Sequence, residues 1–302
     1  MLKKIKRFII TNETAYKISV ILRIKQIKNF FEKTLKFNKK IAASDYFIED
    51  IHYHIIDRCN LNCKNCSSFS PIAKDNVTDI NTFTKDLKRL AELTGGKIKR
   101  LNLTGGEPLL HPDLLKMLSK ARNIFPNIQI RIGTNGILLP NQTDEFWETL
   151  QREKISLIIT RYPIKLNWKT INKKSDDYKI DIDYQGLEIG KKTSHHFPLD
   201  TEGGQDGKYN YENGKCNGCY YLKNGKFSIC SIPVTVNIFN EYFNKNIPVM
   251  ESSFIDIYKA SDIKEILDYI SKPIDACRYC AVKKRTYNSL WGVSKKEISE
   301  WI

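Results

Sequence analysis

The sequence predicts an α/β protein with a parallel sheet, a cysteine-rich C-terminal extension and a basic N-terminal helix. Apolar strand-like runs alternate with amphipathic helical stretches from about residue 51 to about residue 187, the pattern of a parallel sheet with crossover helices. Five of the eight cysteines lie beyond residue 200, and residues 1–44 hold +10 of the net charge of +15. We therefore expect three parts, residues 1–45, 46–200 and 201–302.

The body should begin with a strand and continue as strand and helix in turn. Capping residues, glycines and prolines mark where each helix begins or ends, and connections between parallel strands should be right-handed. The expected strands cover residues 51–56, 98–104, 128–133, 155–160 and 178–184, and the expected helices cover residues 84–93, 111–121, 143–153 and 167–175.

The N-terminal segment has the pattern of a basic amphipathic helix. Apolar residues recur at helical spacing, with lysines and arginines between them. Such a helix can cover the body with a solvated outer face, lie on an anionic membrane surface or bind nucleic acid. We favour packing of this helix against the body. Peripheral contact of residues 1–44 with the inner membrane surface is the alternative. Nucleic acid binding is unlikely because no known binding module is present.

The composition favours a cytoplasmic protein. The apolar stretch near the N-terminus stops at Thr11, too early for a signal peptide, and no apolar run is long enough to span a bilayer. Because cytosolic thiols stay reduced, cysteines at metal-ligand spacing indicate metal sites rather than disulfides.

Three cysteines form the most specific motif. Cys59, Cys63 and Cys66 follow the first predicted strand at the spacing Cys-x3-Cys-x2-Cys. A structural zinc site closes with four protein ligands, and a four-iron cluster is normally held by four thiolates. A group of three therefore predicts a metal centre with one position open for chemistry.

Two further motifs follow in order, Gly105-Gly106-Glu107-Pro108 after the second strand and Thr134-Asn135-Gly136 after the third. With the cysteine motif, they resemble the radical S-adenosylmethionine (SAM) enzymes. The resemblance implies a partial (β/α)6 radical SAM barrel, a [4Fe–4S] cluster on the three cysteines, and SAM bound to the open iron. It also implies a flavodoxin- or ferredoxin-type reductant.

The same resemblance implies roles for residues around SAM. Gly105 and Gly106 would let the backbone approach the ligand, and Glu107 would accept from the SAM ammonium group. Thr134 and Asn135 would contact its ribose or carboxylate, and Thr160 or Arg161 would do so after the fourth strand. The aromatic ring near the adenine would be Phe69, which taken alone reads as a core residue.

The later cysteines predict a second site. Cys230, Cys277 and Cys280 are the firmer ligands, with Cys216 or Cys219 as the fourth. Their layout resembles the twitch domain, which holds one auxiliary [4Fe–4S] cluster in some radical SAM enzymes. By spacing alone, a structural zinc ion fits equally well.

The overall pattern resembles 2-deoxy-scyllo-inosamine dehydrogenase and related radical SAM proteins of carbohydrate and polysaccharide pathways. The resemblance implies an oxidoreductase that abstracts hydrogen from a sugar or cyclitol alcohol. The alternatives are a radical SAM maturase that modifies a peptide and, more distantly, a zinc protein that binds nucleic acid. The sequence does not identify the catalytic base.

Overall fold

The computed structural model describes residues 48–185, 193–214 and 218–302. The predicted basic helix and Cys216 lie outside these residues. In the part of the chain that is described, no helix combines the length and the apolar character needed to cross a membrane.

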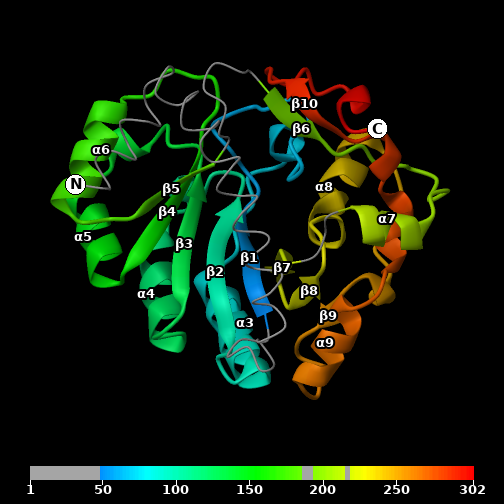
Figure 1. The fold of residues 1–302 in the computed structure, drawn as a ribbon, viewed down its shortest axis with the longest axis horizontal. Helices are drawn as coiled ribbons and strands as arrows, with labels where there is room; N and C mark the ends of the chain where they lie inside the picture. The colour runs from blue at the N-terminus through cyan, green and yellow to red at the C-terminus, as the bar shows by residue number, and fades with distance from the viewer. Residues whose placement is uncertain (1–47, 186–192, 215–217) are drawn as a thin grey trace, which may run out of the picture.

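An eight-stranded sheet forms the centre of the molecule, in the order β5-β4-β3-β2-β1-β7-β8-β9 (Figure 1). The first five strands run parallel to one another in chain order. Their bounds are β1 Ile48–Ile56, β2 Ile98–Gly105, β3 Gln129–Thr134, β4 Ile155–Thr160 and β5 Ile182–Gln185. The predicted parallel α/β body is therefore confirmed.

Helices α3 to α6 connect these strands, and α3 and α4 lie behind the sheet in the view of Figure 1. Local capping explains where two of them begin. The Asp79 carboxylate accepts from the first free N–H groups of α3, and the Thr143 hydroxyl does the same for α5. The bounds are α3 Ile80–Thr94, α4 Leu114–Ile124, α5 Asp144–Arg152 and α6 Trp168–Asp177.

The fifth strand starts later than expected. The sequence predicts a strand over 178–184, but α6 runs to Asp177 and Tyr178 caps its end. Lys179 then takes a φ of 58°, a left-handed turn that a strand cannot contain. The strand therefore begins only at Ile182.

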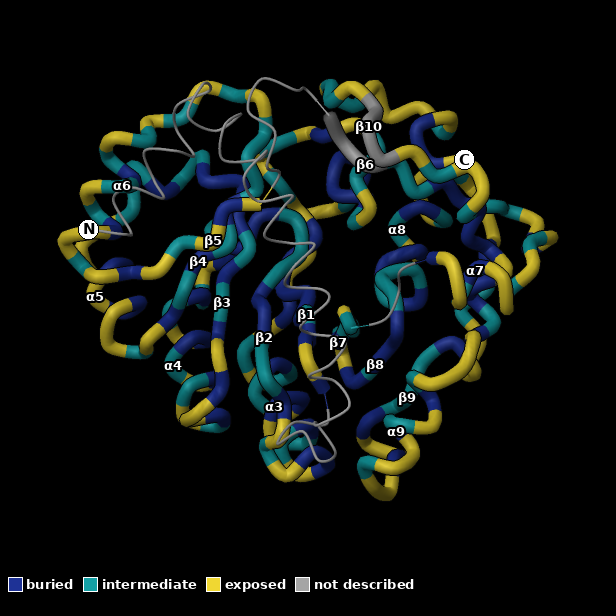
Figure 2. The backbone as a smooth tube through the Cα atoms, viewed as in Figure 1, coloured by how far each residue is buried: buried dark blue, intermediate teal, exposed yellow. Residues whose placement is uncertain are grey.

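The two faces of the parallel strands differ in chemistry. Residues directed towards the helices, such as Tyr53, Leu101 and Ile132, are completely buried and belong to the main core. Figure 2 shows the resulting band of buried backbone along β1, β2 and β3. Alternate positions on the same strands carry polar residues, including Asp50 and Arg131. The sheet thus has one apolar face and one polar face.

The C-terminal part of the chain extends the same sheet. β7 (Tyr220–Lys223) pairs parallel with β1, and β8 (Lys226–Ser228) and β9 (Ile255–Asp256) continue it in antiparallel fashion. The sixth parallel strand therefore lies beside β1 rather than beside β5. A core continuous with that of the body buries Phe227 and Ile266 from this part.

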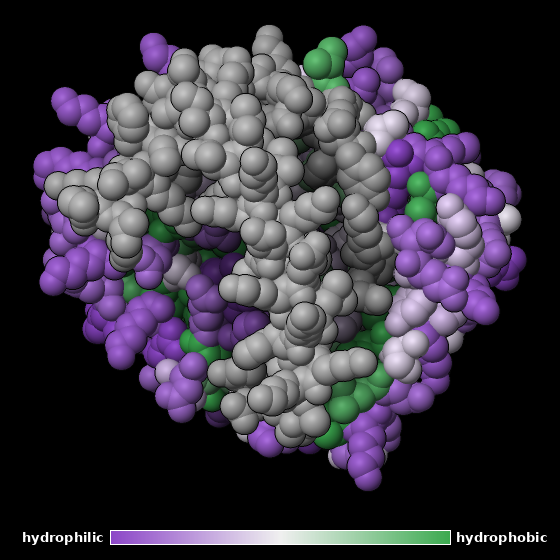
Figure 3. All heavy atoms as spheres, viewed as in Figure 1, coloured by the Kyte–Doolittle hydropathy of each residue, from purple (hydrophilic) through white to green (hydrophobic). Residues whose placement is uncertain are grey.

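The remaining elements surround this extension. A two-stranded sheet pairs β6 (Thr193–His196) with β10 (Thr286–Leu290). Three helices, α7 Gly207–Asn213, α8 Ile232–Phe243 and α9 Ile263–Ile270, lie on this side of the molecule. Both flanks of the face drawn in Figure 3 are mostly hydrophilic.

Candidate active site and cysteine cavity

The cysteine motif lies in the loop directly after β1. All three residues are free thiols, Cys63 buried and the other two partly buried. Burial, helped by the negative charges of Glu107 and of the other two cysteines, raises the pKa of Cys59 to about 12. Burial also raises the pKa of Cys63 to about 11. Cysteine binds metals as the thiolate, and three thiols in one loop are a donor set that fits a metal centre.

Three thiolates would hold a four-iron cluster through three of its iron atoms and leave the fourth open. Among the residues that the structure describes, no group of three His, Cys, Asp or Glu side chains is arranged around a single metal ion.

Gly105 and Gly106 pack the second motif against the cysteine loop. A Cβ on Gly105 would lie 2.2 Å from the Ile56 carbonyl oxygen, and one on Gly106 would lie 2.0 Å from the Arg58 carbonyl oxygen. The Gly106 N–H donates to the Ile56 carbonyl at 2.7 Å. The glycines thus allow the backbones at the carboxyl ends of β1 and β2 to approach each other closely.

Glu107 connects the second motif to the third. Its side chain is 1% exposed. One carboxylate oxygen accepts from the Thr134 hydroxyl at 2.6 Å and from the Leu109 N–H at 3.1 Å, and the other accepts from the Asn135 N–H at 2.9 Å. These bonds oppose the effect of burial, which raises the pKa of Glu107. A carboxylate has about four acceptor positions, so one remains for a ligand amine.

Asn135 closes the set by reaching the cysteine loop. Its side-chain amide donates to the Asn60 side chain at 2.7 Å and lies 3.7 Å from the Cys59 sulfur. The side-chain oxygen of Asn135 accepts from the Ile137 N–H at 2.9 Å. The three predicted motifs therefore meet at the carboxyl ends of β1, β2 and β3.

Two other residues were predicted to contact SAM, and they lie in different surroundings. Thr160 ends β4, at the same edge of the sheet. Phe69 is 3% exposed and packs against Phe239 and Trp301. That surrounding is typical of a core residue and does not support a contact with adenine.

The four described later cysteines line one cavity. Its volume is about 180 Å³, and Cys219, Cys230, Cys277 and Cys280 contribute to its wall. The Arg285 guanidinium donates to the Cys280 sulfur at 2.9 Å. The Asn210 amide donates to the carbonyls of Cys277 and Cys280 at 2.8 and 2.5 Å, which holds the Cys-x2-Cys turn in place.

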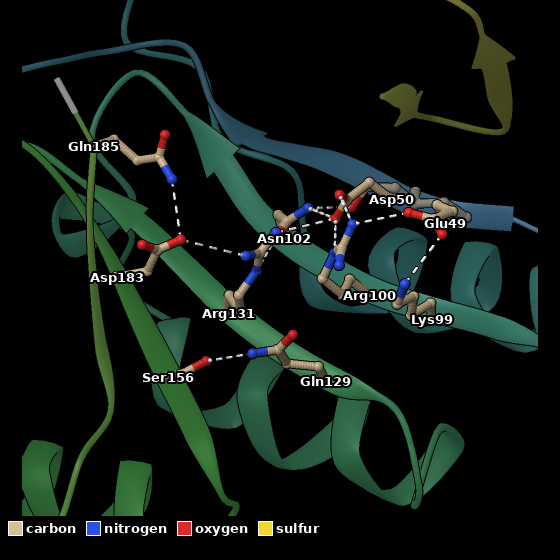
Figure 4. Close-up of polar contacts among 11 residues, drawn as sticks. Glu49, Asp50, Lys99, Arg100, Asn102, Gln129, Arg131, Ser156, Asp183 and Gln185 are labelled. Atoms are coloured by element: carbon tan, nitrogen blue, oxygen red, sulfur yellow. Dashed lines mark hydrogen bonds and ion pairs between the residues drawn. The ribbon is translucent and has the colours of Figure 1, made fainter. Parts of the chain in front are cut away.

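A polar network occupies the face of the sheet opposite α3 and α4 (Figure 4). Asp50 accepts from Arg100 Nε at 2.8 Å, Asn102 Nδ2 at 2.9 Å and Arg131 Nη2 at 3.0 Å. Burial opposes ionisation of Asp50, but these hydrogen bonds and the two guanidinium charges hold its pKa below the usual value. The sequence analysis did not identify this group, although polar residues alternate with apolar ones in each strand.

The polar face reaches the cysteine cavity through β7. Tyr221 lines the cavity, and its ring stacks on His52 with centroids 5.4 Å apart. Burial lowers the pKa of His52 to about 4, so the imidazole is uncharged at neutral pH. Burial, followed by the charge of Asp50, raises the pKa of Cys219, which places this thiol near the network.

Comparison with known proteins matches only part of the chain to relatives. Residues 53–166 match the family model of the radical SAM superfamily. GTP 3',8-cyclase of Staphylococcus carnosus is 29% identical over 154 residues, 48% of this chain and 44% of that protein. The cyclase of Heliobacterium modesticaldum is 30% identical over 117 residues, 37% of this chain and 36% of that protein. The match thus spans less than half the length of these curated relatives.

Solved structures match over a longer stretch but at low identity. The crystal structure of BtrN in complex with AdoMet and 2-DOIA is 16% identical and covers 79% of this chain and 94% of that chain, with a TM-score of 0.48. Streptococcus suis SuiB bound to S-adenosylmethionine is 12% identical and covers 81% of this chain and 68% of that chain, with a TM-score of 0.39.

Proposed function

Because residues 53–166 form a domain of the radical SAM superfamily, we propose that this protein is an enzyme that cleaves SAM reductively and abstracts hydrogen from a sugar or cyclitol alcohol. The oxidation would yield a ketone. One observation carries the first part of the proposal. Three thiols, a buried carboxylate and an asparagine meet at one edge of the sheet, with Asn135 joining Cys59 to Glu107.

Cys59, Cys63 and Cys66 would hold a [4Fe–4S] cluster. With SAM bound, this group supplies a one-electron cleavage that forms the 5′-deoxyadenosyl radical, the species that removes hydrogen from substrate. The residues of the chain position and shield the reacting groups. Asn135 orients the Cys59 thiolate, and Glu107 keeps one acceptor position for the SAM ammonium group.

The second cysteine group supports oxidation. An alcohol that has lost one hydrogen atom must still lose one electron and one proton to become a ketone. An auxiliary cluster in the cavity of Cys219, Cys230, Cys277 and Cys280 would accept that electron. Four thiols around a cavity of about 180 Å³ match the four ligands of such a cluster.

The polar face of the sheet suits a substrate with several hydroxyl groups. Asp50, Asn102 and Arg131 hydrogen-bond to one another there, and substrate hydroxyl groups would bind beside this network. His52 is neutral at physiological pH because burial lowers its pKa to about 4, so its imidazole could form a hydrogen bond with a substrate hydroxyl group without carrying a charge. The stack of His52 on Tyr221 connects this face to the cavity that would take the electron.

The test is anaerobic turnover by reconstituted protein with a reductant and SAM. The substrates are a panel of cyclitols, sugars and nucleotide sugars, with GTP and a peptide pool as the other arms. We expect 5′-deoxyadenosine and a keto product in equal amounts with one of the polyols, and neither product with Cys59→Ala. Absence of SAM cleavage by protein with a full iron content would overturn the proposal. SAM cleavage that occurs only with GTP, or only with a peptide, would show that the substrate belongs to that class and not to the polyols.

A further inference from the structure

Residues 291–301, the covering segment, lie over the cysteine loop after β1. The Lys64 N–H donates to the Gly292 carbonyl at 2.8 Å, and the Ser294 N–H donates to the Asn62 carbonyl at 2.9 Å. Cys63 and Val293 form an antiparallel bridge between these bonds. The loop after β1 is thus paired with a segment more than 200 residues later in the sequence.

Buried contacts hold this covering segment in place. The Glu300 carboxylate accepts from the Ser294 hydroxyl and from the Lys295 N–H, both at 2.6 Å. The Trp301 indole N–H donates to the Cys66 carbonyl at 2.9 Å. Glu300 and Trp301 are each 2% exposed. The covering segment is therefore fixed at the middle and the end of the cysteine motif.

Trp291 enters the site from this segment. Its indole nitrogen is buried and makes no hydrogen bond to any residue that the structure describes. The polar group it approaches is the Cys63 thiol, and the Tyr162 hydroxyl approaches the same sulfur from the loop after β4. The two rings contact each other, with centroids 6.2 Å apart. A buried N–H without a partner is costly, so an acceptor at the Cys63 sulfur would stabilise this geometry.

We propose that Trp291 and Tyr162 are positioning residues that donate hydrogen bonds to the Cys63 thiolate when it binds the cluster, and that they set the cluster's reduction potential. This inference rests on the proposed function, because it requires a cluster on the three cysteines. A neutral thiol is a weak acceptor, whereas a ligating thiolate accepts readily. The N–H of Trp291 is therefore satisfied only in the loaded protein.

The direction of the effect follows from charge. Reduction adds one negative charge to the cluster and its thiolates, and a donor aimed at sulfur stabilises the charged state. Removing one donor should therefore disfavour reduction. Because one hydrogen bond commonly changes an equilibrium by up to about tenfold, the shift should approach ~59 mV for a one-electron couple.

The experiment compares Trp291→Phe with Trp147→Phe in reconstituted protein without SAM. Trp147 is a matched control. It is completely buried, and its indole nitrogen also has no partner among the described residues. It lies in α5, outside the cysteine loop and the covering segment. The variants carry Cys230→Ala and Cys280→Ala, so that one cluster is observed. A redox titration followed by electron paramagnetic resonance should show a lower potential for Trp291→Phe and no change for Trp147→Phe.

A second readout tests the hydrogen bond itself. Pulsed resonance in H₂O and D₂O should show an exchangeable proton coupled to the reduced cluster that disappears in Trp291→Phe. If Trp291→Phe does not load iron, Tyr162→Phe removes the other donor to the same sulfur and should lower the potential in the same direction.

The outcomes separate the two proposals. Full iron loading with an unchanged potential and an unchanged proton coupling in both variants would overturn the assignment of Trp291 and Tyr162. Failure of the parent protein to load iron on Cys59, Cys63 and Cys66 would overturn the proposed function instead.

Discussion

The Glu107 carboxylate accepts a 2.6 Å hydrogen bond from the Thr134 hydroxyl, and both groups are buried. This bond joins the loop after β2 to the turn after β3. The second oxygen of the same carboxylate holds the N–H of Asn135, whose side chain reaches Cys59. Glu107 is thus the structural connection between the glycine motif and the cysteine motif.

Glu107→Gln should weaken this connection. The amide has one acceptor oxygen in place of two, so either the Thr134 hydroxyl or the Asn135 N–H loses its partner. An unsatisfied buried donor costs about 1–3 kcal/mol of unfolding free energy. We expect a lower thermal midpoint and weaker SAM binding, measured by scanning calorimetry and anaerobic titration calorimetry. Glu148→Gln, on the exposed face of α5, should change neither, and equal behaviour of the two variants would contradict the assignment.

Gly106→Ala should displace the cysteine loop. The added methyl group would lie 2.0 Å from the Arg58 carbonyl oxygen, and backbone must move because the neighbour is not a flexible side chain. Iron loading on the first site should fall. Gly204→Ala is the control, since its Cβ would meet the Asp200 carboxylate at an ordinary 3.7 Å. Normal iron content in Gly106→Ala would show that the loops tolerate separation.

Cys280→Ala should separate the two cysteine sites. We expect the iron content to fall from about eight to about four atoms per chain, because one four-iron cluster would be lost. SAM cleavage should persist while formation of the keto product stops, as measured by liquid chromatography with mass detection. Stoichiometric zinc in the wild-type cavity, with no loss of iron in Cys280→Ala, would identify the second site as structural.

His52→Gln should reduce the sensitivity of the protein to acid. The pKa of His52 is about 4 in the folded protein and about 6.5 in the unfolded chain. Between these values the unfolded chain binds the extra proton, so the stabilisation present above pH 6.5 is lost as the pH falls towards 4. The loss amounts to about 3 kcal/mol at most.

The measurement is the urea midpoint of wild type and His52→Gln, each taken between pH 7 and pH 5. The wild-type midpoint should fall more steeply over this range. A constant difference between the two proteins at every pH would show that His52 is not buried as a neutral group.

Local sequence signals predicted the order of the elements and the loops that meet at the candidate site. Strand–helix alternation, capping residues and glycines are local in the chain, and each parallel strand brings its following loop to the same edge of the sheet. The predicted start of the fifth strand at Tyr178 was wrong, because a short polar–apolar alternation also fits the last turn of a helix.

The role of the glycine pair was only partly predictable. Spacing indicated that Gly105 and Gly106 allow a close approach, and the structure shows that the backbone of Ile56 and Arg58, at the end of β1 and just after it, makes one. Sequence spacing does not reveal which segment lies opposite a glycine, because that segment is more than 40 residues away.

By itself, the sequence determined the parallel α/β body, the three thiols after the first strand and the presence of a second cysteine group. These features depend on hydrophobic periodicity and on residue spacing, which are properties of short segments. Only the tertiary structure decided that β7 joins the sheet beside β1, that four later cysteines share one cavity, and that Trp291 lies against Cys63. Such contacts join distant parts of the chain, and they form only when burial of the shared core brings those parts together.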